Sequence, residues 1–253
     1  MAHSGISEGT ITSPSGFRAT GIHAGLKTTR DRDLGLLIAR NACTAAVHMG
    51  ASSGTTGAWS TANVRRNAAD IRAVLVLTGV AGGRGAEAVA ACDTLAALLA
   101  DEAAITPQNV ILLAGGAETP FDMDVLRRGV ARGLDELDSK GGRRLALALA
   151  TTNQTAHMTA IQVELAAGQS VILGGLATSG DLARVIITTN ANVPAKLLNT
   201  ALDAVLSQYP DLDQSAIVLL ANGSADAPAC VHADDAPFAA WQTGLLALVG
   251  ELV

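Results

Sequence analysis

The stretch IRAVLVLTG, residues 71–79, decides the fold class of this chain. It is a continuous apolar run that ends in glycine, which is typical of a strand buried on both faces. The following run, AEAVAACDTLAALLA (residues 86–100), has the 3.6-residue period of an amphipathic helix. TPQNVILLAGG (residues 106–116) then gives a Thr-Pro turn or helix start and a second buried strand. Because strands and helices intermingle in this way along the chain, the sequence predicts an α/β or α+β fold.

The rest of the chain predicts further strands and helices and one long loop. The Gly/Ser/Thr-rich residues 50–63 are expected to form the loop. A hairpin is expected over 157–180, around Ala-Gly-Gln. Single strands are expected at 33–40, 43–49, 143–153, 184–190 and 215–223. Helices are expected at 122–137, 193–208 and 236–253.

The composition indicates a well-buried core and disfavours nucleic-acid binding. Of the 253 residues, 49% are hydrophobic, 16% are charged and only 2% are aromatic. Such a chain has ample apolar surface to bury, and its core is expected to consist of Ala, Val, Leu and Ile. The net charge of −6 provides no phosphate-neutralising face, and few rings are available to stack on bases. We therefore expect no nucleic-acid partner.

Cysteine usage and hydropathy predict a cytoplasmic protein without a membrane segment. Cys43, Cys92 and Cys230 are widely spaced and odd in number, so no disulfide framework is expected. The first 15 residues are polar and do not resemble a signal peptide. No apolar run reaches the roughly 18 residues that a membrane-spanning helix needs.

Two motifs suggest a cofactor or a metal, and each has a simpler interpretation. TGVAGGRG (residues 78–85) fits the nucleotide-binding signature of short-chain dehydrogenases. However, the only tyrosine, Tyr209, is not part of a Tyr-x-x-x-Lys motif, so a glycine-rich turn is favoured. CVHADD (residues 230–235) holds metal-ligand types, but no second such cluster accompanies it, so a solvated loop is favoured. We therefore expect neither a cofactor nor a metal.

Three polar or glycine-rich strand ends are candidate sites for chemistry. LLAGGAETPFDMD (residues 112–124) passes from a strand into a helix, and its backbone N–H groups could form an oxyanion hole or simply a tight turn. TTNQT (residues 151–155) and ATSG (residues 177–180) are rich in hydroxyl groups. These hydroxyls could bind a polar ligand or could cap their own backbone.

The order of these motifs resembles one enzyme family over nearly the whole chain. GFRATGIHAGLK (residues 16–27) with DLGLLIARNACTAAV (residues 33–47) is similar to the N-terminus of the bifunctional ornithine acetyltransferase/N-acetylglutamate synthase family. Six later segments resemble that family in the same order: RAVLVLTGVAGG (72–83), AGGAETPFDMD (114–124), LALATTN (147–153), VILGGLATSG (171–180), IITTNANVPAKLL (186–198) and VLLANGSAD (218–226).

The resemblance implies a layered α/β fold with sheets and flanking helices. It also implies one domain, 1–253, similar to the N-terminal chain and the start of the C-terminal chain of these enzymes. Members cleave themselves before an internal threonine, which then acts as the nucleophile that carries acetyl from N-acetylornithine to glutamate.

The sequence departs from the family at the positions that carry this chemistry. The self-cleavage segment is missing from ATSGDLARVIITTN (residues 177–190), so the nucleophile position falls near Leu182. Ala114-Gly115 replaces the Thr-Gly oxyanion hole, and Thr178 replaces a substrate-binding lysine. The sequence ends at Val253, before the family's catalytic glutamate and further domain.

We therefore expect a non-autoproteolytic relative, a pseudoenzyme that binds a small amino-acid-like or acyl ligand or a partner protein. It is expected to form a homo-oligomer or a complex with a related chain. The alternative is an acyltransferase or amidase that uses Thr178 or Ser179 or is completed by a second chain. A ring-opening hydrolase of the cyanuric-acid type would need a Ser–Lys pair, and none of the three lysines lies next to a plausible serine.

The candidate site residues fall into three groups. Thr178 and Ser179 are the candidate nucleophiles. Gly115 and Gly116 are the candidate backbone donors to an oxyanion. The candidate ligand-binding residues are Thr78, Gly79, Thr151, Thr152 and Asn153.

Overall fold

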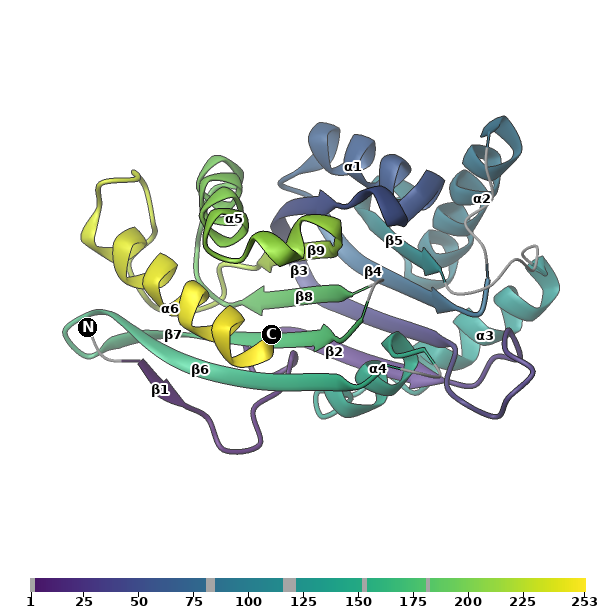
Figure 1. Cartoon of the computed structure of the whole chain (residues 1–253), viewed down its shortest axis with the longest axis horizontal. Helices are drawn as coiled ribbons and strands as arrows, with labels where there is room; N and C mark the ends of the chain where they lie inside the picture. Colours follow the sequence, from purple (N-terminus) through teal and green to yellow (C-terminus); the bar gives the residue numbers. More distant parts are fainter. Residues whose placement is uncertain (1–2, 81–84, 116–121, 152–153, 181–182) are drawn as a thin grey trace.

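A nine-stranded mixed sheet organises the protein, with the strand order β1-β6-β7-β8-β9-β3-β4-β5 and with β2 paired to β3 (Figure 1). The computed structural model describes residues 3–80, 85–115, 122–151, 154–180 and 183–253. The strands are β1 (His3–Gly5), β2 (Phe17–Ile22), β3 (Leu34–Met49), β4 (Ile71–Thr78), β5 (Val110–Gly115), β6 (Ala156–Ala166), β7 (Gln169–Thr178), β8 (Arg184–Thr189) and β9 (Ala216–Ala221). The helices are α1 (Gly54–Asn67), α2 (Gly85–Ala103), α3 (Met123–Asp135), α4 (Gly142–Leu149), α5 (Ala195–Gln208) and α6 (Ala236–Leu252), with short 3₁₀ turns η1 (Ala51–Ser53), η2 (Pro107–Asn109) and η3 (Pro210–Gln214).

The long strand β3 joins the two halves of the sheet. Its first half pairs with β2 and β4, its second half pairs with β9, and the register shifts between Ile38 and Cys43. The expectation of two separate strands, 33–40 and 43–49, is therefore wrong. Arg40 and Asn41 are exposed where the strand changes partners, which explains why the apolar pattern is interrupted without ending the strand.

Side-chain alternation along the strands sorts the core into layers. In β4, Val76 faces an inner cluster to which both halves of the sheet and α4 contribute, whereas Leu77 packs with α2 and α3. In β8, Ile186 joins the same inner cluster and Ile187 faces α5 and α6. Because successive strand residues point to opposite faces, strands buried on both sides need two covering layers. The predicted layered arrangement of sheets and flanking helices is confirmed.

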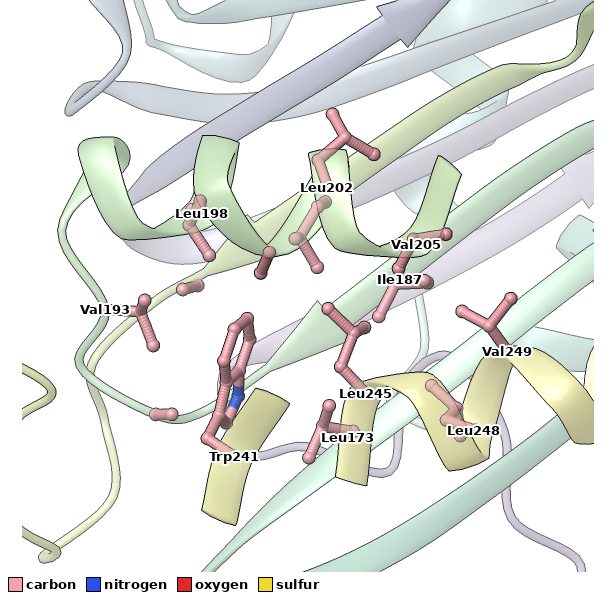
Figure 2. Close-up of a cluster of buried hydrophobic side chains, with 14 of the residues drawn as sticks. Leu173, Ile187, Val193, Leu198, Leu202, Val205, Trp241, Leu245, Leu248 and Val249 are labelled. Atoms are coloured by element: carbon pink, nitrogen blue, oxygen red, sulfur yellow. The ribbon is translucent and has the colours of Figure 1, made fainter. Parts of the chain in front are cut away.

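The outer layer over β6–β9 is closed by α5 and α6 around Trp241. Figure 2 shows Trp241 and Leu245 of α6 beside Leu198 of α5 and Leu173 of β7. Trp241 is fully buried, and its ring lies 6.0 Å from that of Phe238 between centroids. In a chain with so few aromatic residues, these rings supply much of the apolar area that fixes α6 on the sheet.

The predicted loop over 50–63 is wrong, because most of it forms η1 and α1. Polar side chains of α1 complete the edge of the sheet at β5. The Ser60 hydroxyl accepts from the Leu112 N–H and donates to the Leu112 carbonyl, both at 2.9 Å. The Asn63 amide donates to the Val110 carbonyl at 2.9 Å. These tertiary hydrogen bonds stabilise a helix whose Gly, Ser and Thr content opposes it.

The predicted strand over 143–153 is also wrong, because its first part forms α4. Leucines alternate at 145, 147 and 149, but alanines fill the positions between them, so a helical face is equally apolar. The helix buries Leu145 and Leu149 and leaves Leu147 exposed. It packs closely on β2, where the missing side chain of Gly21 makes room for the Arg144 carbonyl.

The remaining predicted elements are confirmed within a few residues. The strands expected at 71–79, 109–116, 184–190 and 215–223 are β4, β5, β8 and β9. The hairpin over 157–180 is β6 and β7, with Gly168 at positive φ in its turn. The helices expected at 86–100, 122–137, 193–208 and 236–253 are α2, α3, α5 and α6.

Candidate functional site

The candidate site lies where β4 and β5 end and β8 begins, beside the C-terminal end of α4. The parallel pairing of β4 and β5 places Thr78 opposite Gly115 at the carboxyl ends of both strands. In sheets of this kind, that edge is where ligands are usually bound. The helix α4 directs its last carbonyl groups towards the same place, which gives this edge a partial negative charge.

Three successive carbonyls at the end of α4 each accept a hydrogen bond from a different segment. The Thr78 hydroxyl donates to Ala148 at 3.0 Å. The Arg184 guanidinium donates to the next carbonyl, that of Leu149, at 3.0 Å. The Lys27 ammonium donates to the third, that of Ala150, at 3.2 Å. The helix end therefore brings β4, the start of β8 and the β2–β3 loop together.

The β2–β3 loop, which carries Lys27, is folded around the carboxylate of Asp33. That carboxylate is fully buried and accepts four backbone N–H groups. The bonds come from Ala24 to Oδ1 at 2.5 Å and from Gly25, Leu26 and Lys27 to Oδ2 at 3.0, 2.7 and 3.1 Å. The run GFRATGIHAGLK (residues 16–27) therefore forms the strand β2 and a loop whose backbone N–H groups surround the Asp33 carboxylate. This arrangement fixes the position of the Lys27 backbone.

Lys27 is a half-buried cation that forms no ion pair within the described residues. Its Nζ donates to the carbonyls of Arg32 at 3.1 Å and Ala150 at 3.2 Å. Burial lowers its pKa, the charges of Asp31 and Asp33 oppose that shift, and the charge of Arg184 adds to it. Gly79, at positive φ, lies beneath the lysine stem, because a Cβ there would approach Lys27 Cγ to 2.6 Å.

Arg184, the first residue of β8, is only 4% exposed. Burial lowers the pKa of its guanidinium to about 10. Among the described residues, the Leu149 carbonyl is its one side-chain hydrogen-bond acceptor, and no carboxylate lies within ion-pair distance. Its Nη2 faces Gly115, where a Cβ would come within 2.7 Å of it. The residue predicted as an oxyanion donor therefore lies against a buried cation.

The two predicted nucleophiles have different environments. Thr178 ends β7 and is 4% exposed, and its Oγ1 accepts a hydrogen bond from the backbone N–H of Arg184 at 3.0 Å. Ser179 is exposed, and its Oγ lies 3.1 Å from the Thr155 hydroxyl, which in turn lies 3.3 Å from His157 Nε2. Thr178, Ser179 and His157 line an open cavity of about 600 Å³, which extends to η3 and the end of α6. Ser179 thus has an imidazole within two hydrogen bonds.

The other predicted site residues are only partly described. Gly115 ends β5, and its carbonyl accepts the Gly79 N–H at 3.2 Å. Thr78 is fully buried, and the backbone N–H of Thr151 donates to the Gln154 side chain at 3.1 Å. Gly116, Thr152 and Asn153, and also the nucleophile position near Leu182, lie outside the described residues. The ligand-binding roles of all these residues stay predictions.

Sequence reasoning missed Lys27, Arg184, Asp33 and His157. A charged residue in a loop or at a strand start gives no signal by itself, and the partners of Lys27 and Arg184 are backbone carbonyls. The best available signal was the acid that follows a glycine-rich run, since Asp at a turn often accepts backbone N–H groups.

Two other sequence motifs were considered above, and one of them, TGVAGGRG, includes residues 81–84, which lie outside the described residues. In CVHADD, Cys230 is buried, and the Asp235 carboxylate accepts the His232 N–H at 2.7 Å, so that acid closes the turn. Over the described residues, no three His, Cys, Asp or Glu side chains gather as metal ligands do. All three cysteines are free and buried. None of the helices in the described part of the chain is long and apolar enough to cross a membrane.

Sequence comparison relates the chain to arginine-biosynthesis proteins. The sequence model of the ArgJ family matches residues 18–251. The arginine biosynthesis bifunctional protein ArgJ of Synechocystis sp. is 32% identical over 190 residues, which are 70% of this chain and 43% of the relative. The protein of the same name from Synechococcus sp. is 30% identical over 254 residues, covering 87% of this chain and 57% of the relative. The chain spans about half the length of these curated relatives.

Solved structures share the fold at lower sequence identity. The ArgJ protein of Bacillus halodurans aligns with a TM-score of 0.62 and 24% identity, over 70% of this chain and 93% of that one. The ornithine acetyltransferase of Mycobacterium tuberculosis, solved with ornithine, gives 0.61 and 23%, over 70% and 94%. A β-aminopeptidase of Burkholderia sp. gives 0.57 and 13%, over 99% and 88%. These likenesses bear on the fold alone.

Proposed function

This chain belongs to the ArgJ family, and from that premise we propose that it is an uncleaved, ornithine-acetyltransferase-like protein that binds a small amino-acid-like or acyl ligand without threonine-nucleophile catalysis. The ligand is placed at the carboxyl ends of β4 and β5, beside Gly115. The observation that carries the proposal is the state of Thr178. The Thr178 hydroxyl oxygen is buried and already accepts a hydrogen bond from the backbone N–H of Arg184, so it is poorly placed to attack an acyl group.

The short connection between β7 and β8 supports the same conclusion. Residues 179–183 read SGDLA and contain no threonine. A threonine freed by cleavage would use its own amine as the base for its hydroxyl. Without a threonine at this connection, the family's chemistry has no nucleophile there. An amino-acid ligand is favoured because the structurally similar enzyme of M. tuberculosis was solved with ornithine.

Two measurements on the purified chain test this proposal. Intact-mass spectrometry should give one full-length species, and two fragments that divide between residues 177 and 184 would contradict the uncleaved state. Thermal unfolding with ornithine, N-acetylornithine and N-acetylglutamate should show a raised midpoint for at least one of them, since a ligand specific to the folded state stabilises it. No shift with any of the three would contradict the binding function. A homo-oligomer, a complex with a related chain and a cytoplasmic location stay predictions.

A second candidate function is favoured by the contacts of Ser179. If His157 carries its proton on Nδ1, its Nε2 can take the Thr155 proton while Thr155 takes that of Ser179. The serine oxygen would then attack an acyl carbon, and the imidazolium would protonate the leaving amine or alcohol. This chemistry is that of an acyltransferase or amidase, which the chain would perform itself or together with a second chain.

The serine hypothesis predicts a specific pattern of activity loss. Acetyl transfer from N-acetylornithine to glutamate, or acyl hydrolysis, should be lost in Ser179→Ala and in His157→Ala. It should persist in Ser170→Ala, since Ser170 lies on the same hairpin but accepts only from the Gln162 amide. Activity that survives in Ser179→Ala would exclude this mechanism, and the absence of activity in the wild-type chain would favour the first proposal.

A further inference from the structure

We propose that Arg184 and Lys27 together form the recognition site for a carboxylate of the bound ligand, as in a free or N-acylated amino acid. This inference rests on the proposed ligand-binding function and adds the group that the site recognises. It concerns two cations that none of the sequence motifs pointed to, and it begins with the unusual state of Arg184.

A buried guanidinium normally pairs with an acid or uses most of its donors. Arg184 is 4% exposed, yet its side chain has one described acceptor, the Leu149 carbonyl. A guanidinium has five N–H donors, so four remain without a described protein partner. A buried charge left in this state is costly, and an anion that accepts two of these donors would offset the cost.

Lys27 brings a second positive charge to the same helix end. The two cations bind consecutive carbonyls, Leu149 and Ala150, so they enter from different segments and converge. The proximity of Arg184 contributes to the lowered pKa of Lys27. Within the described residues, only the Arg32 and Ala150 carbonyls accept from Lys27, so one of its three N–H donors has no described partner. Like charges placed together at a half-buried edge favour an anionic third component.

Stabilisation of α4 accounts for only part of this arrangement. A helix C-terminus carries roughly half of a negative charge, whereas two full positive charges meet it here. The buried acid nearby, Asp33, already accepts four backbone N–H groups and does not pair with either cation within 4 Å. The carbonyls at the helix end therefore explain how the two cations are positioned. They compensate only part of the positive charge and accept only some of the N–H donors.

The local backbone lets both cations approach the ends of β4 and β5 closely. A Cβ on Gly115 would lie 2.7 Å from Arg184 Nη2, and a Cβ on Gly79 would lie 2.6 Å from Lys27 Cγ, so glycine at these positions brings the two cations to the same strand ends. A guanidinium presents parallel N–H groups that match the two oxygens of a carboxylate. The carboxyl ends of β4 and β5 are also the expected ligand edge of a parallel pair. A carboxylate is therefore the ligand group that fits both the charge and the shape.

The test compares an acid with its amide on the full chain. N-acetylornithine and its carboxamide differ only at the carboxylate, and both are titrated calorimetrically into the wild-type protein. We expect the acid to bind at least about tenfold more tightly, because charge-assisted hydrogen bonds are lost with the amide. The preference should vanish in Arg184→Gln and weaken in Lys27→Gln. It should be unchanged in Arg128→Gln, which alters an exposed arginine of α3.

The outcomes separate this inference from the proposed function. Equal binding of acid and amide, or a full acid preference in folded Arg184→Gln, overturns the carboxylate site and leaves ligand binding intact. Binding of neither compound overturns the carboxylate site, and it overturns the proposed function as well if ornithine and N-acetylglutamate also give no thermal shift. If Arg184→Gln does not fold, ¹⁵N-arginine spectra of the wild-type chain decide. A guanidinium resonance that shifts with the acid and not with the amide, and is absent from the spectrum of Arg184→Lys, supports the site, and unchanged resonances overturn it.

Discussion

Replacement of Asp33 by asparagine tests the loop that positions Lys27. In the wild-type chain, one fully buried carboxylate accepts the N–H groups of Ala24, Gly25, Leu26 and Lys27. Asparagine keeps one oxygen, which would turn towards the three N–H groups that bind Oδ2. The fourth, from Ala24, would then face an NH₂ group and lose its acceptor. The side chain would also lose the charge that strengthens the other three bonds.

The expected loss of stability follows from these four bonds. A buried N–H left without an acceptor costs about 1–3 kcal/mol, and a hydrogen bond to a charged group is worth about 1 kcal/mol more than a neutral one. Three weakened bonds and one lost bond predict a loss of about 4–6 kcal/mol in the free energy of unfolding. This is a large part of the 5–15 kcal/mol that holds a typical domain folded.

The assay combines guanidinium denaturation with hydrogen exchange. Denaturation gives the change in unfolding free energy, and exchange reports whether the amides of residues 24–27 lose protection before the rest of the chain. The control is Asp31→Asn, because the Asp31 carboxylate is exposed and, among the described residues, accepts only the Thr29 hydroxyl, at 2.8 Å. It should change stability by no more than about 0.5 kcal/mol. A loss below about 1 kcal/mol for Asp33→Asn, with the four amides protected as before, would refute the reasoning.

Three further predictions concern packing, a buried hydrogen bond and pH. Gly21→Ala should lower the free energy of unfolding by about 3 kcal/mol or more in a denaturant titration, because the new Cβ would lie 2.0 Å from the Arg144 carbonyl oxygen. The control Gly5→Ala, whose Cβ would have no atom within 4 Å, should change it by no more than about 0.5 kcal/mol. Ser60→Ala should cost about 2 kcal/mol, since it leaves a buried N–H and a buried carbonyl of β5 unpaired; an unchanged unfolding midpoint would contradict this. Burial raises the pKa of the Cys43 thiol from 9.0 to about 12, so the folded chain keeps a proton that the unfolded chain releases. The unfolding free energy should therefore fall by about 1.4 kcal/mol per pH unit above pH ~9 through this thiol, and Cys43→Ala should show a shallower fall than the wild type.

The sequence predicts best those elements whose apolar pattern has a single interpretation. The runs at 71–79, 184–190 and 215–223 are too short and too continuous to be amphipathic helices, and each forms a strand buried on both faces. The pattern fails where it is ambiguous or where tertiary contacts decide. Alternating Leu and Ala at 145–149 suits either a strand or a helix, and α1 depends on hydrogen bonds to β5 that lie far away in the sequence.

The candidate site was predictable only as a set of strand ends. Gly115 and Thr178 were identified because they end runs with clear strand character. In the structure both lie against Arg184: Gly115 faces its Nη2, and the Thr178 hydroxyl accepts its backbone N–H. The cations themselves were missed for a related reason. Their partners are the Leu149 and Ala150 carbonyls, and residues 143–153 were expected to form a strand, so no helix end was available to attract a positive charge.

Position 184 shows how this fold accommodates different chemistry at its site without changing its core. Alternation along β8 directs Arg184 and Ile186 towards the same interior. Ile186 is fully buried in the inner apolar cluster, where a cation would meet no acceptor. Arg184 lies one pleat earlier, at the first residue of the strand, where the apolar cluster gives way to the last carbonyls of α4. The same strand therefore demands an apolar side chain at one position and tolerates a charge two residues before it. Because the sheet ends are where core packing and free helix carbonyls meet, a charged side chain can be placed at such an end while the rest of the strand keeps the apolar pattern that specifies the fold.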